Sequence, residues 1–534
     1  MKKIGIDFGT TNSTLSYVNP ENNALECYKM GRAGGAEYIP SFISYEKEGN
    51  AVGIGDAARL RQADDDYMVF SRFKMLLNET DEDRLRREGY ESKTPVECAR
   101  DYLKTLLETY RKENNLDDLE HLVITVPEIW IKENDHTSRK TLAGICEELS
   151  LPLKRLLSEP TAATAYFSDC YKKKNGGWYD GHVLVCDYGG GTLDLSLSHI
   201  QSGQITVLES TGKGHDDRMI GKAGAAFDAA TVRRVFERES GEKISSIDLK
   251  FLKLLGEFEK GKITLQDEVG EKLKQYLRYR EIDKKLFNID GFSVQSSDMV
   301  HTFQELIRAD FEAALADMKS AMEQLGVDYE HREKFRVVMA GGFSGFYLVR
   351  EAAREILGAG KPGSDDPRFK RVFTLQDVAL SIAKGAALVA NDIVRIERAC
   401  PVSVGLRLQV DPGDGIHGPQ DVPILAKGTQ ISDYHKPVFL PGGVEINMDL
   451  AALNNDIVIF LGDGKHRRHH RLDKNVSQLL PNIEDRDNRW QVGFSVDENL
   501  LFTFHAKDRR GNVKDTALGD ILRAFSGPIY RKEG

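Results

Sequence analysis

The chain has 534 residues, of which 40% are hydrophobic and 29% charged, and a formal net charge of -10. This length excludes a single hydrophobic core and predicts two to four domains, and the composition excludes a largely disordered chain. Lys and Arg are spread along the sequence, no apolar run reaches 18 residues, and the start lacks a signal-peptide pattern. We therefore expect a cytoplasmic protein that binds neither nucleic acid nor a membrane.

Two distant segments share one pattern, an apolar strand that ends in Asp and is followed by glycine and threonine. They are KIGIDFGTTNSTLSYV at residues 3–18 and HVLVCDYGGGTLDLSLS at residues 182–198. A second apolar run follows the glycines in each segment, which predicts a β-hairpin rather than a strand and a helix. The repetition predicts two related subdomains that face one another.

A third apolar strand, Phe335–Ala340, ends in Gly341 and Gly342, and Ser344 is placed to cap the amphipathic helix that follows. Apolar residues recur at helical spacing in two other segments, residues 96–110 and 245–261. Strands and helices therefore alternate, which predicts a mixed α/β architecture.

Beyond about residue 400 the helical periodicity is replaced by short alternating strands, at residues 456–461, 490–496 and 500–506. This pattern predicts a separate all-β domain. The basic run KHRRHHRLDK at residues 465–474 is interpreted as a solvated hairpin end, with an anionic partner or an adventitious metal as alternatives.

Six cysteines are isolated along the chain, without a CxxC pair or metal-ligand spacing. They predict thiols in a reducing compartment: Cys27, Cys98, Cys146, Cys170, Cys186 and Cys400.

Asp7 and Asp187 end buried strands, where a carboxylate is costly unless a cation or hydrogen-bond donors meet it. A hydrated magnesium ion would serve both. Nearby glycines let backbone amides approach an anion, and threonines add hydroxyl donors: Gly9, Thr10, Thr11, Gly189, Gly190, Gly191 and Thr192. Either segment alone could be a plain tight turn. Together with Gly341 and Gly342, they predict one phosphate site between two lobes.

Other phosphate-binding folds do not fit the sequence. No GxxxxGK[ST] loop is present, which excludes a P-loop NTPase, and no GxGxxG opens a helix after the first strand, which argues against a dinucleotide fold. The HRD, DFG and lysine set of a protein kinase is also missing.

Five motifs in register, IGIDFGTTNS, LVITVPEIW, LLSEPTAATAYF, VLVCDYGGGTLDLS and VVMAGGFSG, resemble the ATPase domain of the heat-shock protein 70 (DnaK) family. ACPVSVGL, PILAKGTQI and FSVDENLLFTFHAKDRRG resemble its substrate-binding half. The resemblance implies an actin-like (ribonuclease H-like) two-lobed α/β ATPase domain at residues 1–392, followed by a linker at 393–399. A β-sandwich substrate-binding-like domain at 400–520 and a tail at 521–534 complete the chain.

The resemblance also implies roles for single residues. Asp7 and Asp187 would hold magnesium through water, and the two glycine and threonine turns would wrap the β- and γ-phosphates of ATP. Lys74, in VFSRFKML, resembles the catalytic lysine, and Glu159 and Asp194 would orient the attacking water. The implied catalytic set is Lys74, Glu159, Asp187, Thr192 and Asp194.

Glu259 and Lys262 fall where the family contacts the ribose and base, and Gly341 and Gly342 where it contacts the nucleoside and α-phosphate. The resemblance likewise implies a proline switch and an arginine relay, Pro127 and Arg139. From the residues alone, Glu259 and Lys262 would be a solvated helix face, and Pro127 a strand terminator.

The implied function is that of a chaperone, in which slow ATP hydrolysis is coupled to transient binding of unfolded or specific polypeptides. A J-domain co-chaperone and a nucleotide exchange factor are the implied partners. The alternative is a docking module that holds nucleotide with little turnover and serves one dedicated partner.

Several departures from the family put turnover in question. The altered linker and the missing lid favour the docking alternative, whereas an intact set of site residues favours the enzyme: Asp7, Lys74, Glu159, Asp187 and Thr192. The adenine-stacking arginine of GGSTR is Gly345 here, and Phe343 adds a ring. GGEDFD appears as GKAGAAFD, Asp377 is displaced, and the leucine-rich linker is replaced by IVRIERACP. The chain ends at Gly534 without sequence for a helical lid, so client exchange is expected to be fast.

Overall fold

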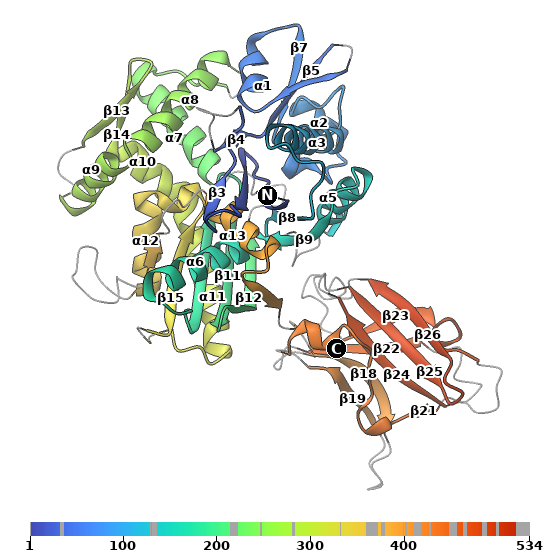
Figure 1. Cartoon of the computed structure of the whole chain (residues 1–534). Helices are drawn as coiled ribbons and strands as arrows, with labels where there is room; N and C mark the ends of the chain where they lie inside the picture. The colour runs from blue at the N-terminus through green and yellow to red at the C-terminus, as the bar shows by residue number, and fades with distance from the viewer. Residues whose placement is uncertain are drawn as a thin grey trace. The chain divides into compact units, whose positions relative to one another are not determined.

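The structure is a computed structural model. It describes residues 2–31, 37–47, 49–128, 130, 136–213, 223–245, 248–279, 283–329, 331, 333–358, 372–374, 380–398, 400, 403–410, 418–426, 429–447, 456–462, 467–482, 489–497 and 501–519. The chain divides into two compact units, residues 1–204 with 209–395, and residues 205–208 with 396–534 (Figure 1). The expected boundaries at residues 392 and 400 stay a prediction.

The first sheet of the larger unit has the strand order β3-β2-β1-β8-β9, with β4 beside β2. Its strands are β1 (Lys3–Asp7), β2 (Asn12–Val18), β3 (Leu25–Cys27), β4 (Ile39–Pro40), β8 (His121–Val126) and β9 (Leu153–Ser158). β1 pairs antiparallel with β2 and parallel with β8. The first glycine hairpin is therefore confirmed. The strands β1 and β8 are apolar in succession, as expected for strands buried on both faces.

The second sheet repeats this plan, in the order β16-β15-β10-β11-β12-β17. Its strands are β10 (Gly181–Tyr188), β11 (Leu193–Gln201), β12 (Gln204–Lys213), β15 (Phe335–Ala340), β16 (Val372–Thr374) and β17 (Arg395–Arg398). β10 pairs antiparallel with β11 and parallel with β15, which places Asp187 opposite both Asp194 and Ala340. The second hairpin is confirmed, and so is the internal repeat.

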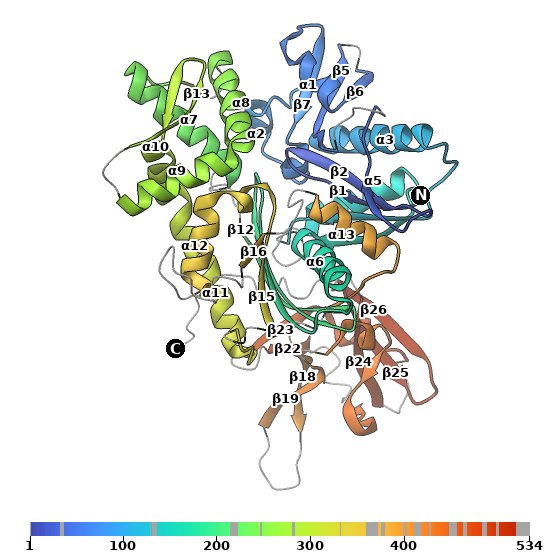
Figure 2. The same cartoon turned by 60° about the vertical axis from the view of Figure 1, so that its left-hand side comes forward.

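Small residues let two helices approach these sheets closely. Helices α6 (Glu159–Asn175) and α13 (Ser381–Ala390) lie side by side in Figures 1 and 2. A Cβ atom at Gly385 would lie 1.8 Å from the carbonyl oxygen of Ala162, and one at Gly5 would lie 2.2 Å from the amide nitrogen of Ala387. The alanines of SEPTAATAY and AKGAALVA therefore serve close packing between the two sheets.

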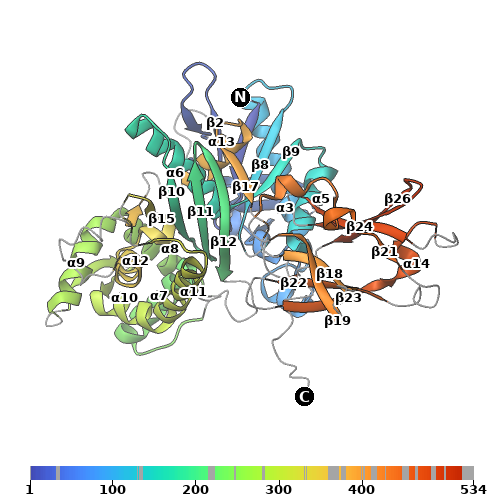
Figure 3. The ribbon, with the colours of Figure 1, turned by 90° about the horizontal axis from the view of Figure 1, so that it is seen from below.

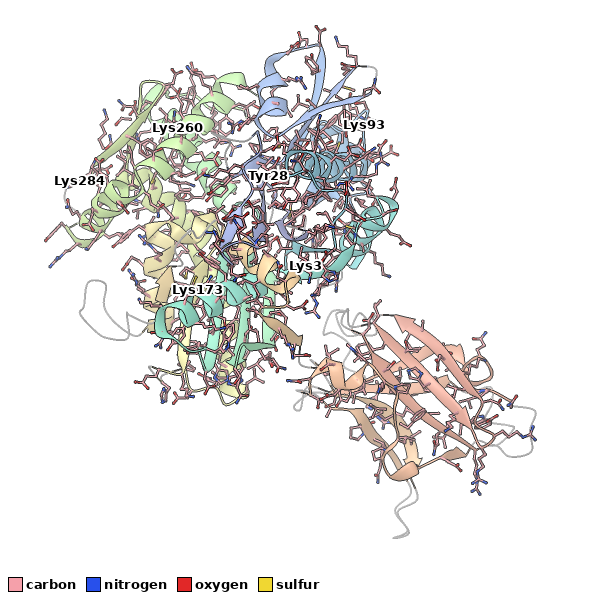
Figure 4. All side chains as sticks on the ribbon, viewed as in Figure 1. Lys3, Tyr28, Lys93, Lys173, Lys260 and Lys284 are labelled. Atoms are coloured by element: carbon pink, nitrogen blue, oxygen red, sulfur yellow. The ribbon has the colours of Figure 1, made fainter. Side chains whose placement is uncertain are left out.

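The remaining elements of the larger unit cover the sheets or extend from them. In the first lobe, Tyr28, labelled in Figure 4, packs edge-on against Tyr110 of α3 at a ring distance of 5.1 Å. The first-lobe elements are β5 (Phe42–Glu46), β6 (Ala51–Ile54), β7 (Tyr67–Ser71), α1 (Asp56–Leu60), η1 (Arg61–Ala63), η2 (Phe73–Leu76), α2 (Glu82–Arg87), α3 (Pro95–Glu113) and α5 (His136–Glu148).

In the second lobe, the hairpin of β13 and β14 lies with α7 to α10 (Figure 2). The second-lobe elements are α7 (Gly224–Ser240), α8 (Leu249–Thr264), α9 (Gln266–Tyr279), β13 (Lys285–Ile289), β14 (Phe292–Gln295), α10 (Ser296–Thr302), η3 (Phe303–Arg308), α11 (Ala309–Gln324), η4 (Gly342–Gly345) and α12 (Tyr347–Gly358).

The smaller unit consists mainly of two antiparallel sheets, β19-β18-β22-β23 and β20-β24-β25-β26 with β21 beside β24 (Figure 3). Alternating apolar residues of both sheets, among them Leu406, Ile459, Trp490 and Phe504, share one core. The elements are β18 (Ser403–Val410), β19 (Gly418–Leu425), η6 (Ile431–Tyr434), β20 (Val438–Phe439), η7 (Pro441–Gly443), β21 (Ile446–Asn447), β22 (Asp456–Gly462), β23 (Arg467–Asn475), α14 (Val476–Leu479), β24 (Arg489–Val496), β25 (Phe502–Asp508) and β26 (Val513–Gly519). The predicted all-β region is confirmed.

Two local predictions are wrong. Ser344 is not the helix cap: its hydroxyl donates to the Cys186 carbonyl at 3.0 Å and accepts from the Tyr188 amide at 3.1 Å, and the helix begins only at Tyr347. The basic run is not a loop from Arg467 onward, because it pairs with β22 as strand β23. Its first two residues, 465 and 466, lie outside the described residues.

The predicted linker is a strand over part of its length. Residues Arg395–Arg398 form β17, next to β12 in the sheet. The charged side chains of IVRIERACP are therefore compatible with a paired strand. Within the described residues, no helix combines the length and apolar character needed to cross a membrane.

Candidate functional site

The two glycine turns lie against each other, although they are about 180 residues apart in the sequence. A Cβ atom at Gly190 would lie 3.2 Å from the hydroxyl oxygen of Thr11, and one at Gly191 would lie 3.4 Å from that of Thr10. The two β-hairpins therefore bring their tips together, one from each lobe. The sequence pattern predicted this meeting of the two glycine turns.

Each turn is fixed by its own backbone. A Cβ atom at Gly9 would lie 2.0 Å from the carbonyl oxygen of Asn12, and the Ser41 hydroxyl donates to the Gly9 carbonyl at 2.7 Å. In the second turn, the Gly189 amide donates to the Thr192 carbonyl at 3.0 Å. Because side chains are absent, backbone amides are left accessible to an anion between the turns.

The start of α7 holds the second turn from the other side. The amides of Gly224 and Ala225 donate to the carbonyls of Gly189 and Gly190, at 3.2 Å and 3.0 Å. This is the segment that replaces GGEDFD in the sequence. Its first residues, 221 and 222, lie outside the described residues.

Gly341 follows β15 and touches Asp187. Its φ is 77°, and a Cβ atom there would lie 2.3 Å from Asp187 Oδ1. Another residue would suffer both left-handed backbone strain and a clash with the carboxylate. By contrast, a Cβ atom at Gly342 would meet nothing within 4 Å. The third glycine turn is therefore part of the same site.

Four carboxylates and one lysine lie at the convergence: Asp7, Glu159, Asp187, Asp194 and Lys74. Lys74 Nζ donates to Glu159 Oε1 at 2.6 Å, and both side chains are buried. The Lys74 ammonium also lies 5.9 Å from the ring of Phe8 and 5.7 Å from that of Trp130. The turn η2, which follows the left-handed Arg72, places Lys74 in this position.

The crowding of carboxylates changes their protonation. Burial, with the nearby Glu159 charge, raises the pKa of Asp7 to about 7, although Lys74 and the Thr125 hydroxyl oppose the shift. Burial and neighbouring carboxylates hold the pKa values of Asp187 and Asp194 well above their usual range. Ionising all of these carboxyl groups together is therefore costly, because Lys74 only partly offsets the raised pKa values.

Magnesium fits this charge pattern. Asp187 Oδ2 and Asp194 Oδ2 are buried and have no hydrogen-bond partner within the described part of the chain. A hydrated cation would supply both the missing donors and the missing positive charge. No group of three or more His, Cys, Asp or Glu in the described ranges is arranged to ligate a metal directly. The arrangement therefore suits a metal held through water.

The two residues of α8 that are predicted to contact the nucleoside differ in their surroundings. Lys262 Nζ donates to both oxygens of Asp228, at 2.6 Å and 2.7 Å, and lies 5.5 Å from the ring of Phe343. Glu259, one turn earlier on α8, is exposed. Phe343 itself is buried against Tyr188, at a ring distance of 5.1 Å, and other aromatic rings.

The implied switch residues are also located. Pro127 directly follows β8, and Arg139 is buried on α5. Asp377, the displaced acidic residue, lies outside the described residues.

Sequence reasoning missed Glu128, which follows Pro127 in ITVPEIW. Its side chain is fully buried and accepts from the Ser210 hydroxyl at 2.6 Å, and its amide donates to Asp194 Oδ1 at 2.9 Å. The Thr125 hydroxyl, also unforeseen, donates to Asp7 Oδ1 at 3.1 Å. The sequence offered one signal for both residues, because they lie at or just beyond the end of β8. That strand pairs with β1 and ends beside Asp7.

The larger unit has two related sheets, and a β-hairpin of each ends at the shared site. Helices rich in small residues pack between the sheets, and the glycine turns surround acidic side chains. These features define an actin-like two-lobed ATPase fold. The sequence profile of the Hsp70 protein family matches residues 3–391. The chain belongs to the Hsp70 family. Members of this family bind ATP, act as ATPases and bind polypeptide clients.

The relatives are distant. The chain is 23% identical over 529 residues to the chaperone protein DnaK of Cenarchaeum symbiosum, covering 95% of this chain and 71% of that protein. It is 24% identical to DnaK of Metamycoplasma hominis, covering 96% and 78%. It is 29% identical over 410 residues to the chaperone protein HscA of Cronobacter sakazakii, covering 73% and 58%.

Proposed function

We propose that this protein binds and slowly hydrolyses Mg-ATP between its two lobes, and uses that cycle to bind polypeptide clients transiently. The supporting observation is the meeting of two glycine hairpins around Lys74 and four carboxylates, of which Glu159, Asp187 and Asp194 are buried. Such an excess of buried negative charge is costly unless a cation is bound.

In this proposal the turns receive the phosphates. Backbone amides at Gly9, Gly190 and Gly191 donate to phosphate oxygens, while the Gly189 amide closes the turn onto the Thr192 carbonyl. The hydroxyls of Thr10, Thr11 and Thr192 add donors. Gly341 lets the chain pass close to the α-phosphate beside Asp187. The turns are preformed, so little ordering cost is incurred on binding.

Asp7 and Asp187 would hold magnesium through its water shell, and Asp194 and Glu159 would orient the attacking water. Lys74 neutralises charge that develops on the transferring phosphate, and Glu159 keeps the ammonium in place. Magnesium would supply charge neutralisation of the β- and γ-phosphates. Thr192, whose hydroxyl hydrogen-bonds Asp194, fixes the carboxylate that faces the water.

The nucleoside would lie along α8 and η4, with Glu259 toward the ribose and Lys262, Gly341 and Gly342 beside the nucleoside. The antiparallel sheets of the smaller unit would bind the polypeptide. Pro127 and Arg139 would relay between nucleotide and client.

Phosphate release with Mg-ATP, measured with and without an unfolded peptide, tests this proposal. Peptide should stimulate release by the wild type, and Thr192→Ala and Lys74→Ala should abolish release and stimulation together. Absence of Mg-ATP binding in titration calorimetry would refute the proposal.

A second candidate is a docking module with little turnover that serves one dedicated partner. The charged side chains Arg395, Glu397 and Arg398 in the linker strand β17 favour it, because they replace the leucines of the family. The same assay separates the two: Mg-ATP binding with a slow release rate indifferent to peptide would support docking.

A further inference from the structure

The cation nearest to the proposed nucleoside position is already engaged. Lys262 donates to both oxygens of Asp228, and the two side chains are 14% and 8% exposed. The ammonium also lies 6.0 Å from the ring of Phe227 and 5.5 Å from that of Phe343, so its shift toward a base would break a largely buried ion pair. Lys262 therefore has at most one N–H left for a base, and the ion pair with Asp228 fixes its direction.

Among the described neighbours, Gln266 at the start of α9 has a side-chain group that could read a base edge, whereas Ile263 and the glycines of η4 have none. Ile263, the next residue on α8, is an aliphatic side chain that is 62% exposed, and Figure 4 labels Lys260 on the same helix. Gly342 and Gly345 carry no side chain. The Gln266 amide donates to the Gly345 carbonyl at 3.0 Å, which fixes that side chain against the η4 turn.

Adenine and guanine differ in the hydrogen-bonding groups of the six-membered ring. A site with buried groups that pair with one pattern rejects the other strongly, whereas an apolar surface separates them poorly. The exposed Glu259 can reach only what all ribonucleotides share, if it faces the ribose as proposed. The triphosphate, held by the turns, would provide most of the affinity.

We infer that this site accepts purine nucleoside triphosphates with little discrimination between adenine and guanine. The inference rests on the proposed function, because it concerns the base portion of the same site. Three observations support it: Lys262 is paired with Asp228, the Gln266 amide is bonded to the Gly345 carbonyl, and Gly345 has no side chain.

The test is titration calorimetry of the full chain with Mg-ATP, Mg-GTP and magnesium tripolyphosphate. The dissociation constants for ATP and GTP should agree within about tenfold. ATP at least a hundredfold tighter than GTP would overturn the inference and leave the proposed function standing. Failure of all three to bind would remove the proposed function, and this inference with it.

Gly345→Arg provides a gain-of-function arm. A Cβ atom there would lie 3.2 Å from Gln266 Nε2, the end of a flexible side chain, so the substitution needs only a small displacement. The guanidinium should stack on either purine and tighten ATP and GTP several-fold, without changing tripolyphosphate. Equal effects on all three would show that the base lies elsewhere, which overturns the inference. Gln266→Ala should leave the ATP to GTP ratio unchanged, and a tenfold change would show that Gln266 reads the base.

Discussion

Asp7→Asn should stabilise the ligand-free protein at neutral pH while destroying its use of magnesium. Asp7 is half-buried, and the pKa of its carboxyl is raised to about 7, against an ordinary value of 3.8. Ionising it in the fold is therefore costly. Asn has the same shape and can still accept the Thr125 hydroxyl, so the substitution removes charge without opening a cavity.

The size of the effect follows from linkage. Since the folded-state pKa of Asp7 is raised, its contribution favours folding below about pH 4 and is lost as the pH rises toward about 7. A shift of roughly three units corresponds to about 4 kcal/mol, and roughly 2 kcal/mol of this falls between pH 5 and 7.

Urea unfolding of the ligand-free wild type and the variant at pH 5 and pH 8 is the assay. The variant should be more stable at pH 8 by a few kcal/mol, and the difference should shrink at pH 5. Asp65→Asn, at an exposed aspartate, is the control and should change neither value. Mg-ATP should stabilise the wild type but not Asp7→Asn. Equal stability of the variant and the wild type at pH 8 would refute the account of the charged cluster.

Three further substitutions test other parts of the site. Gly341→Ala should destabilise the protein by about 1–3 kcal/mol and abolish nucleotide binding, because the new methyl group would meet a carboxylate oxygen. Calorimetry measures the binding. Gly342→Ala is the control and should do neither, because a Cβ atom there meets open space. Lys74→Met should abolish phosphate release and lower the unfolding free energy by about 3–5 kcal/mol, since its buried carboxylate partner loses its cation. Glu128→Gln should leave KM for ATP unchanged and move the pH profile of phosphate release to lower pH, because the Glu128 charge contributes to the raised pKa of Asp194. An unshifted profile would contradict that assignment.

The frame of the site could be predicted because its signals are local. The runs around Asp7 and Asp187 pair an apolar strand with glycines, and both hairpins appear where the pattern put them. Strand Phe335–Ala340 also appears as predicted, parallel to β10. Local propensity and the buried pattern agree at these positions, which is the condition under which sequence reasoning succeeds.

The failures come from residues whose partners are distant in the chain. Ser344 has the spacing of a helix cap, but its hydroxyl is claimed by the backbone of β10, more than 150 residues away. Lys262 pairs with Asp228 on another helix, a contact that spacing along α8 does not predict, and its place beside a nucleoside stays a prediction. Such competition between local and long-range hydrogen bonds cannot be read from spacing.

Glu128 shows why the chemical core of the site is harder to foresee than its frame. A glutamate after a strand-ending proline is unremarkable in sequence, and only the convergence of two lobes gives it Asp194 as a neighbour. Its burial adds another negative charge to an already crowded cluster, which ordinary selection for stability would remove. A bound cation would offset the destabilisation that this buried charge causes in the ligand-free protein. The excess of buried acid is therefore stronger evidence for a metal-bound phosphate here than any single glycine turn.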